Sequence, residues 1–156
     1  MIAIQRISSN DWREWRELRL EALREAPYAY GSTLAQWQGD GDTEERWRHR
    51  LESVPFNVIA YLDERPAGIV SATHPDENAS SELISMWVAP FARGRGAGDA
   101  LVQSVVQWAH EQRLHRIALA VTVGNEHALA LYSRHGFVDA GIIEDGERSL
   151  SLSIGA

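Results

Sequence analysis

The sequence predicts a single α/β domain over residues 1–156, with a mixed central sheet of about six or seven strands flanked by about four helices. Three observations lead to this fold class. The chain has 156 residues, the length of one domain with a substantial core. Strand-like and helix-like apolar patterns alternate along it without internal repeats, low-complexity tracts or linkers. Residues 82–123 contain a strand, a helix and a second strand, a β-α-β unit that requires local parallel pairing.

The N-terminal third is expected to hold one strand and two helices. Near-alternation of apolar and polar residues over residues 2–7 predicts the strand. A helix is then predicted to begin near Asp11, whose spacing to Glu14 matches a capping box, and to end before the next proline. Residues 28–41 have the composition of a loop, and a short helix is predicted over residues 42–53. The first helix has an apolar face formed by Trp12, Trp15, Leu18, Ala22 and Leu23.

The rest of the chain alternates strands with helices. Residues 56–62 and 67–73 are strand-like runs separated by a four-residue turn, as in a β-hairpin. Gly136 stands where a left-handed glycine commonly ends a helix. The other predicted elements are a strand over residues 82–88, a helix from residue 98, a buried strand over 117–123, a helix over 126–135, and strands over 137–143 and 147–154.

Composition argues against several classes of protein. The formal net charge is −7 and the isoelectric point is near 5.3, whereas a nucleic-acid binder normally has a basic excess or a basic face. Because the chain has no cysteine, disulfides, thiolate–metal sites and a cysteine nucleophile are excluded. No stretch approaches the roughly 20 apolar residues of a membrane span, and the N-terminus lacks the pattern of a signal peptide. A cytoplasmic protein without nucleic-acid or membrane partners is therefore expected.

The most informative segment is residues 88–101, which places three glycines and two arginines between a strand and the first turn of a helix. Glycines let a backbone approach a ligand closely, and a helix N-terminus adds partial positive charge, so the segment favours a bound pyrophosphate. The Gly-Lys-Ser/Thr ending of a P-loop is missing. A dinucleotide fingerprint starting at Gly94 would need glycine at Asp99.

The segment instead resembles the acetyl-CoA signature R/Q-x-x-G-x-G/A of the GCN5-related N-acetyltransferases (GNAT). Arg93, Gly96 and Gly98 occupy its fixed positions, with Val88 and Pro90 before them. Residues 119–137 resemble a second family element, N-x-x-A-x-x-L-Y-x-x-x-G-F, through Asn125, Ala128, Leu131, Tyr132, Gly136 and Phe137. Two coupled elements in the right order are far more specific than one glycine-rich loop. The close match covers residues 82–137.

This resemblance implies acetyl-CoA as cosubstrate and assigns its binding residues. The strand around Trp87 and Val88 would offer backbone groups to the pantetheine arm and an N–H to the thioester oxygen. Arg95 would contact the pyrophosphate, the 3′-phosphate of CoA or solvent. Asn125 would cap the following helix, lie near the cofactor arm, or both. The backbone that would hold the pyrophosphate runs through Arg93, Gly94, Arg95, Gly96, Ala97, Gly98 and Asp99.

The resemblance also implies two catalytic residues. Tyr132 matches the family tyrosine that protonates the departing thiolate, and pKa values of about 8.5 for a thiol and about 10 for a phenol suit that transfer. The competing interpretation is an aromatic residue that only packs. Glu82 lies eleven residues before Arg93, the offset of the catalytic glutamate in histone-acetylating members. It is the candidate base for an amine that must lose a proton before it attacks, although an exposed glutamate at a strand start is commonplace.

The acceptor side carries no family-wide motif. Tyr30, Trp37 and His74 are candidate substrate-binding residues, and Tyr28 and Trp47 could extend them into an aromatic wall or simply cover the core. A small-molecule amine is the expected acceptor, with a protein N-terminus or lysine as the alternative. A non-catalytic acyl-CoA sensor is the alternative of another class. No metal is expected, and residues 137–154 are candidates for a homodimer interface.

Overall fold

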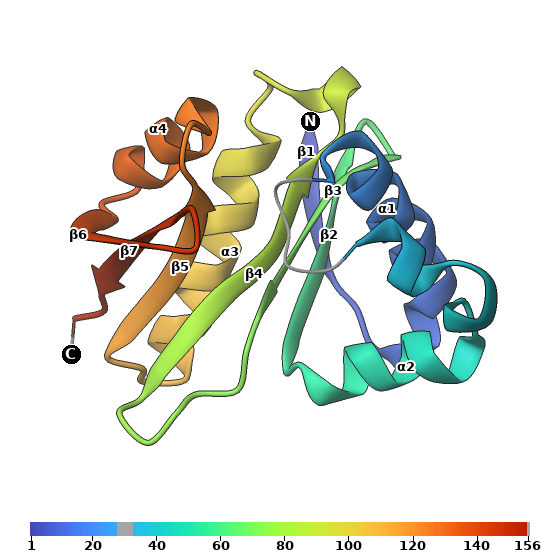
Figure 1. The fold of residues 1–156 in the computed structure, drawn as a ribbon, viewed down its shortest axis with the longest axis horizontal. Helices are drawn as coiled ribbons and strands as arrows, with labels where there is room; N and C mark the ends of the chain where they lie inside the picture. Colours follow the sequence, from blue (N-terminus) through green and yellow to red (C-terminus); the bar gives the residue numbers. More distant parts are fainter. Residues whose placement is uncertain (28–32, 156) are drawn as a thin grey trace.

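The computed structural model describes residues 1–27 and 33–155, which form seven strands, four α-helices and four short 3₁₀-helices. The strands form one mixed sheet in the order β1-β2-β3-β4-β5-β7-β6, which confirms the predicted fold class (Figure 1). The strands are β1 (Ile2–Arg6), β2 (Phe56–Leu62), β3 (Arg65–Ala72), β4 (Ser80–Val88), β5 (Arg116–Thr122), β6 (Val138–Glu144) and β7 (Glu147–Ser153). The α-helices are α1 (Trp12–Glu25), α2 (Glu44–Ser53), α3 (Ala97–Glu111) and α4 (Glu126–Arg134).

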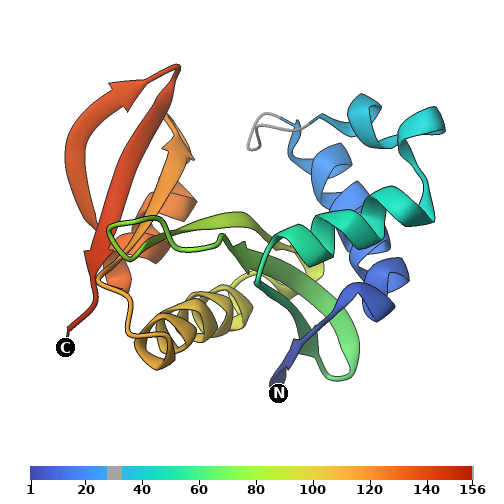
Figure 2. The ribbon, with the colours of Figure 1, turned by 90° about the horizontal axis from the view of Figure 1, so that it is seen from below.

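Helices cover both faces of the sheet. Successive side chains of a strand point to opposite faces, so Val58 and Ala60 of β2 join the core cluster that contains the apolar face of α3. Ile59, between them, joins the cluster built on Trp15 of α1 and Trp47 of α2. Figure 2 shows α1 and α2 on one side of the sheet and α3 on the other.

The sheet is divided in its middle, where β4 and β5 pair only briefly. Their parallel register covers Ser80–Glu82 of β4 against Arg116–Ala118 of β5. Beyond these residues the two strands diverge, as Figure 1 shows, although both continue for several residues. Beyond these residues, the backbone groups of β4 therefore do not pair with those of β5.

A β-bulge bends β4 beside this split. Ile69 of β3 pairs with Trp87, whereas Ser71 pairs with Ile84, so two residues of β4 stand opposite one of β3. Ser85, in the bulge, has a φ of 56°, a left-handed conformation that is uncommon for a residue other than glycine. The bulge re-aims the side chains of β4 where the strand leaves β5.

The start of α1 differs from its prediction. The Asp11 side chain does not cap α1. Its Oδ2 instead accepts a hydrogen bond from the Ser8 backbone N–H at 2.9 Å. Ser8 and Asp11 form the capping box of a 3₁₀-turn, η1, that precedes the helix, so the predicted pairing of Asp11 with Glu14 was wrong. The 3₁₀-helices were not predicted because segments of three or four residues carry too little periodicity. They are η1 (Ser9–Asp11), η3 (Leu34–Trp37), η4 (Gly39–Gly41) and η5 (Pro90–Ala92).

Candidate active site

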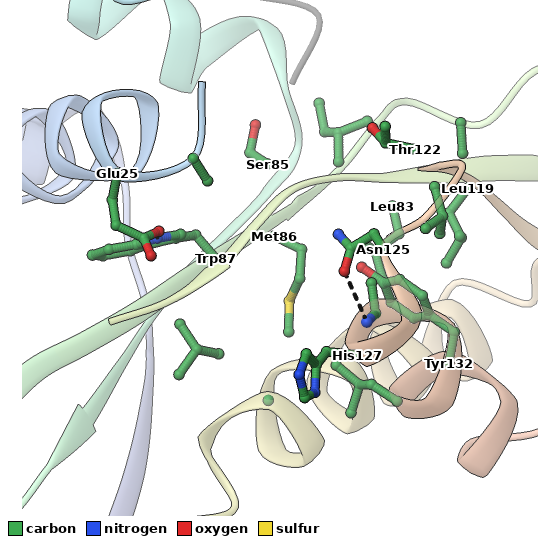
Figure 3. A pocket seen from close by; sticks show the side chains of 18 of the residues that line it. Glu25, Leu83, Ser85, Met86, Trp87, Leu119, Thr122, Asn125, His127 and Tyr132 are labelled. Carbon is green, nitrogen blue, oxygen red and sulfur yellow. Dashed lines mark hydrogen bonds between the residues drawn. The ribbon is translucent and has the colours of Figure 1, made fainter. Parts of the chain in front are cut away.

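A cleft of about 1550 Å³ opens where β4 and β5 diverge. Its two long walls are residues 82–88 of β4 and residues 119–125, which run from β5 into the start of α4. The loop before α3 closes one end, and side chains from α1 and α2 line the other side. Figure 3 shows Met86 between Asn125, His127 and Tyr132 on one side and the pair Trp87 and Glu25 on the other.

Trp87 and Val88 form the part of β4 that leads into the loop. Trp87 is buried, and its Nε1 donates a hydrogen bond to Glu25 Oε2 at 3.0 Å. Val88 is half-buried and lines the cleft. The position of both residues on the β4 wall agrees with the backbone role that the resemblance implies.

Arg93 is held by Glu25 at the last turn of α1. Its Nη2 contacts Glu25 Oε1 at 2.8 Å, and its Nε donates to the Val88 carbonyl at 3.1 Å. Partial burial pushes the pKa of Glu25 up, but the hydrogen bonds from Trp87 and Arg93 outweigh it and hold this pKa below its ordinary value. The ionised Glu25 therefore ties α1 to β4 and to the loop.

Two glycines of this loop have conformations and surroundings that suit a ligand. Gly94 and Gly96 have φ values of 75° and 91°, and a Cβ on either would meet no atom within 4 Å. Both line the cleft, and Gly96 is the N-cap residue of α3, which has no side-chain cap. The first N–H groups of a helix lack partners within it, so an anion beside Gly96 would find donors there.

The other residues of the loop have different surroundings. Gly98 lines the cleft but packs closely, since a Cβ there would lie 3.3 Å from a methyl group of Leu131. Ala97 is buried, and neither it nor Arg95 is among the residues that line the cleft. Arg95 instead lies near enough to Asp63 to contribute to the lowered pKa of that carboxyl.

Asp99 lines the cleft and links α3 to the end of α4. Its Oδ1 lies 2.7 Å from His135 Nε2 and 2.9 Å from Arg134 Nη2. The hydrogen bond with His135, followed by that with Arg134, lowers the pKa of Asp99 despite partial burial. The carboxylate is thus already engaged by two side chains of this chain, His135 and Arg134.

Asn125 and Tyr132 lie on the opposite wall. Asn125 Oδ1 accepts a hydrogen bond from the Ala128 N–H at 3.2 Å, which makes it the N-cap of α4, and its side chain also lines the cleft. Tyr132 is buried, lines the cleft, and packs edge-on against Phe137 with ring centroids 5.7 Å apart. Both interpretations of each residue, structural and functional, are therefore compatible with its position.

The remaining predicted residues are spread more widely. Glu82 is exposed and lines the cleft where β4 and β5 part. Trp37 is half-buried, lines the cleft and packs on Trp47 with ring centroids 4.3 Å apart. His74 is exposed and is not among the residues that line the cleft, and Tyr30 lies outside the described residues, as does Tyr28.

Several polar residues of the cleft were not predicted. Glu25 and Arg19 come from α1, Arg50 from α2, and Ser85 from the bulge of β4. None belongs to a motif, and the helical pattern of α1 marked only its apolar face. The helix ends would have been the one usable signal, because Glu25 and Arg50 both lie in the last turn of their helix.

Two further features bear on function. Among residues 1–27 and 33–155, no three His, Asp or Glu side chains are grouped so that they could hold a metal ion. In the same part of the chain, none of the helices has the length and apolarity needed to cross a bilayer.

Comparison with solved structures defines the class of fold. An acetyltransferase of the GNAT family from Streptococcus pneumoniae superposes with a TM-score of 0.79 at 22% identity, covering 99% of this chain and 100% of that one. The PaiA N-acetyltransferase from Thermoplasma acidophilum, in complex with coenzyme A, gives a TM-score of 0.79 at 14% identity, covering 98% and 99%. The chain thus has the fold of these acetyltransferases.

The sequence model of the acetyltransferase (GNAT) family matches residues 10–137. The chain belongs to this family, and the resemblance predicted from its two motifs is confirmed. An uncharacterized N-acetyltransferase of Methanocaldococcus jannaschii is 23% identical over 148 residues, 90% of this chain and 62% of that protein. A mycothiol acetyltransferase of Paenarthrobacter aurescens is 40% identical over 65 residues, 42% of this chain and 19% of that protein. The chain therefore spans less than two thirds of the length of these relatives.

Proposed function

We propose that the chain is an N-acetyltransferase that moves an acetyl group from acetyl-CoA directly to the primary amine of a small molecule. The observation that carries the proposal is the cleft between β4 and β5. It runs from a glycine loop at an uncapped helix N-terminus to a chamber lined by α1 and α2. Family membership supports acetyl-CoA as the donor.

The cleft fits the two chemically different parts of CoA. Gly94 and Gly96 leave open space above a backbone whose N–H groups would donate to a pyrophosphate. The diverging strands leave backbone groups of residues 83–88 facing residues 119–124, where an extended amide-containing arm would find donors and acceptors. Arg93, which also lines the cleft, supports this end by fixing the loop to Glu25.

When bound, acetyl-CoA supplies an acetyl group activated as a thioester. The acceptor amine forms the new C–N bond, the C–S bond breaks, and the thiolate takes up a proton. Tyr132 Oη would give that proton from the α4 wall, and the backbone N–H groups of β4 near Trp87 would polarise the thioester oxygen. Glu82 would accept a proton of the acceptor, directly or through water, from its exposed place in the cleft.

A small acceptor fits the side of the cleft under α1 and α2. Trp15, Trp37 and Trp47 all line it, and the first and last of these are fully buried. Helices and a 3₁₀-turn cover this side, whereas a protein acceptor would need an open groove. A metabolite is therefore preferred over a peptide end.

The test follows CoA-thiol release from acetyl-CoA over a panel of amines and peptides. Tyr132→Phe is expected to lower kcat by about 100-fold, the lower end of the range for general acid catalysis, because the phenylalanine cannot protonate the thiolate. Its matched control is Tyr61→Phe: the Tyr61 hydroxyl donates to Glu14 Oε2 at 2.7 Å and lies outside the cleft lining. All fifteen Lys and Arg residues are arginines, so lysine self-acetylation adds no background.

Each outcome has a clear meaning. Acceptor-dependent release that falls in Tyr132→Phe and persists in Tyr61→Phe supports the proposal. Tight acetyl-CoA binding without release from any acceptor would favour a sensor. If calorimetry detects no acetyl-CoA binding at all, the proposed function is wrong.

A further inference from the structure

Two arginines lie at the side of the cleft that faces α1 and α2. Arg19 comes from α1 and is buried, with 8% of its surface exposed. Arg50 comes from the last turn of α2 and is half-buried. Both line the cleft. A surface arginine needs no explanation, but a buried and a half-buried arginine beside a cavity are unusual, because arginine is mostly exposed.

The polar partners of Arg50 are all neutral. Its Nη1 donates to Asn57 Oδ1 at 3.2 Å, and its Nη2 donates to Ser71 Oγ at 3.2 Å and Ser85 Oγ at 3.1 Å. The guanidinium also lies over the ring of Trp15, 5.1 Å from its centroid. Of the residues that the structure describes, none places a carboxylate within salt-bridge distance of Arg50. By contrast, carboxylates pair with Arg16, Arg48, Arg93, Arg134 and Arg148.

The local electrostatics favour a negative ligand. Burial, followed by the positive charge of Arg19, lowers the pKa of Arg50 to about 10. Even so, Arg50 is protonated at neutral pH, so the site holds a positive charge. No carboxylate of the described residues lies beside Arg50 to offset the cost of removing this charge from water. An anionic group bound here would form charge-assisted hydrogen bonds with a planar guanidinium.

The position of Arg50 relates this charge to the reaction. Arg50 contacts Ser85 in the bulge of β4, two residues before Trp87. In Figure 3 the Ser85 side chain projects from β4 away from the side where Asn125 and Tyr132 lie. A molecule anchored at Arg50 thus lies beside β4, where the acceptor must approach the thioester of the proposed reaction.

We propose that the acceptor amine also carries an oxyanion group, a carboxylate or a phosphate, which Arg50 binds with Arg19 beside it. This inference rests on the proposed function, because it names the substrate class of the same site. It also reverses the simplest expectation from a net charge of −7, which would suit a purely cationic amine.

The test compares matched acceptors. Each amino acid is assayed beside its amide and its decarboxylated amine, and O-phosphoethanolamine is assayed beside ethanolamine. In the wild type, kcat/KM is expected to be at least about 10-fold higher for acceptors with the oxyanion, as for other charge-assisted hydrogen bonds. Arg50→Gln should remove this preference mainly through KM and leave the KM for acetyl-CoA unchanged. The arm with the larger ratio distinguishes carboxylate from phosphate.

The matched control is Arg48→Gln on the same helix, since Arg48 pairs with Glu44 and lies outside the cleft. It should keep the wild-type preference. Equal turnover of acids and amides by the wild type, or a preference that survives Arg50→Gln, would overturn the inference while leaving the transferase intact. If Arg50→Gln does not fold, the wild-type ratio decides, together with competitive inhibition by deaminated acids. Absence of transfer to every amine would instead be a failure of the proposed function.

Discussion

Asp42 joins three parts of the molecule through one carboxylate. Its Oδ1 accepts hydrogen bonds from Arg16 Nε at 2.7 Å and from Trp47 Nε1 at 2.8 Å. Arg16 belongs to α1 and Trp47 to α2, while Asp42 precedes α2. The carboxylate therefore fixes the two helices over the cleft and orients the tryptophan on which Trp37 packs.

Asp42→Asn is expected to destabilise the protein by about 1–2 kcal/mol at pH 7, because it removes the charge and keeps the shape. The hydrogen bonds from Arg16 and then Trp47 lower the pKa of Asp42 to about 2 from an ordinary value of 3.8. A lowered folded-state pKa gives stability that is present above about pH 4 and is lost as the pH falls towards 2. Urea unfolding followed by tryptophan fluorescence should thus show that the difference in free energy of unfolding between the wild type and Asp42→Asn shrinks between pH 7 and pH 3. A difference of the same size at both pH values would contradict this role of the Asp42 carboxylate.

Local contacts decided which site residues could be predicted. Asn125 was predicted as a helix cap because its partner, the Ala128 N–H, is three residues away. Arg50 was missed because its partners Asn57, Ser71 and Ser85 are 7, 21 and 35 residues away. No local pattern records contacts made by strand pairing. The half of the cleft that contains the glycine loop could therefore be inferred from motifs, whereas the half that contains Arg50 could not.

At the scale of elements, the segment from β4 to α3 was predicted closely. The predicted strand over residues 82–88 is observed as Ser80–Val88, and the helix expected from residue 98 begins at Ala97. Both follow from apolar periodicity and glycine placement, which are local. The bulge at Ser85 was not predicted, because it arises from the register with β3 and involves no glycine.

Gly96→Ala is expected to weaken CoA binding by at least about 10-fold. Alanine at a φ of 91° carries roughly 1–2 kcal/mol of strain, and its methyl group enters the space above the loop. Gly146→Ala is the matched control, since Gly146 has a φ of 75°, open surroundings and a place in the turn between β6 and β7. Calorimetry should find similar destabilisation in both variants but weaker CoA binding only in Gly96→Ala. Equal CoA affinities would exclude the loop from the cofactor site.

At the scale of the whole molecule, the sheet consists of two parts joined by a short seam. Pairing between β4 and β5 covers three residues of each strand, while α3 packs against both β3 and β5. The fold class was predictable because the order of the elements and the β-α-β unit restrict the possible topologies. The depth of the split was not, because it depends on where two strands stop pairing. The homodimer remains a prediction, and β6, the edge strand at the C-terminal end of the sheet, exposes Val138 and Ile143.

A ligand that occupies the split should stabilise both parts together. CoA at 100 times its Kd is expected to add about 2.7 kcal/mol to the free energy of unfolding, which raises Tm by roughly 5–10 °C for a chain of this size. Hydrogen exchange should slow in residues 83–88 and 119–124 as well as in the glycine loop, because the arm of CoA would use backbone groups of both walls. The control ligand is 3′-phosphoadenosine 5′-diphosphate, which lacks the pantetheine arm and should protect the loop alone. If CoA also protects only the loop, the split does not hold the arm, and the acetyl group would have to meet its acceptor elsewhere.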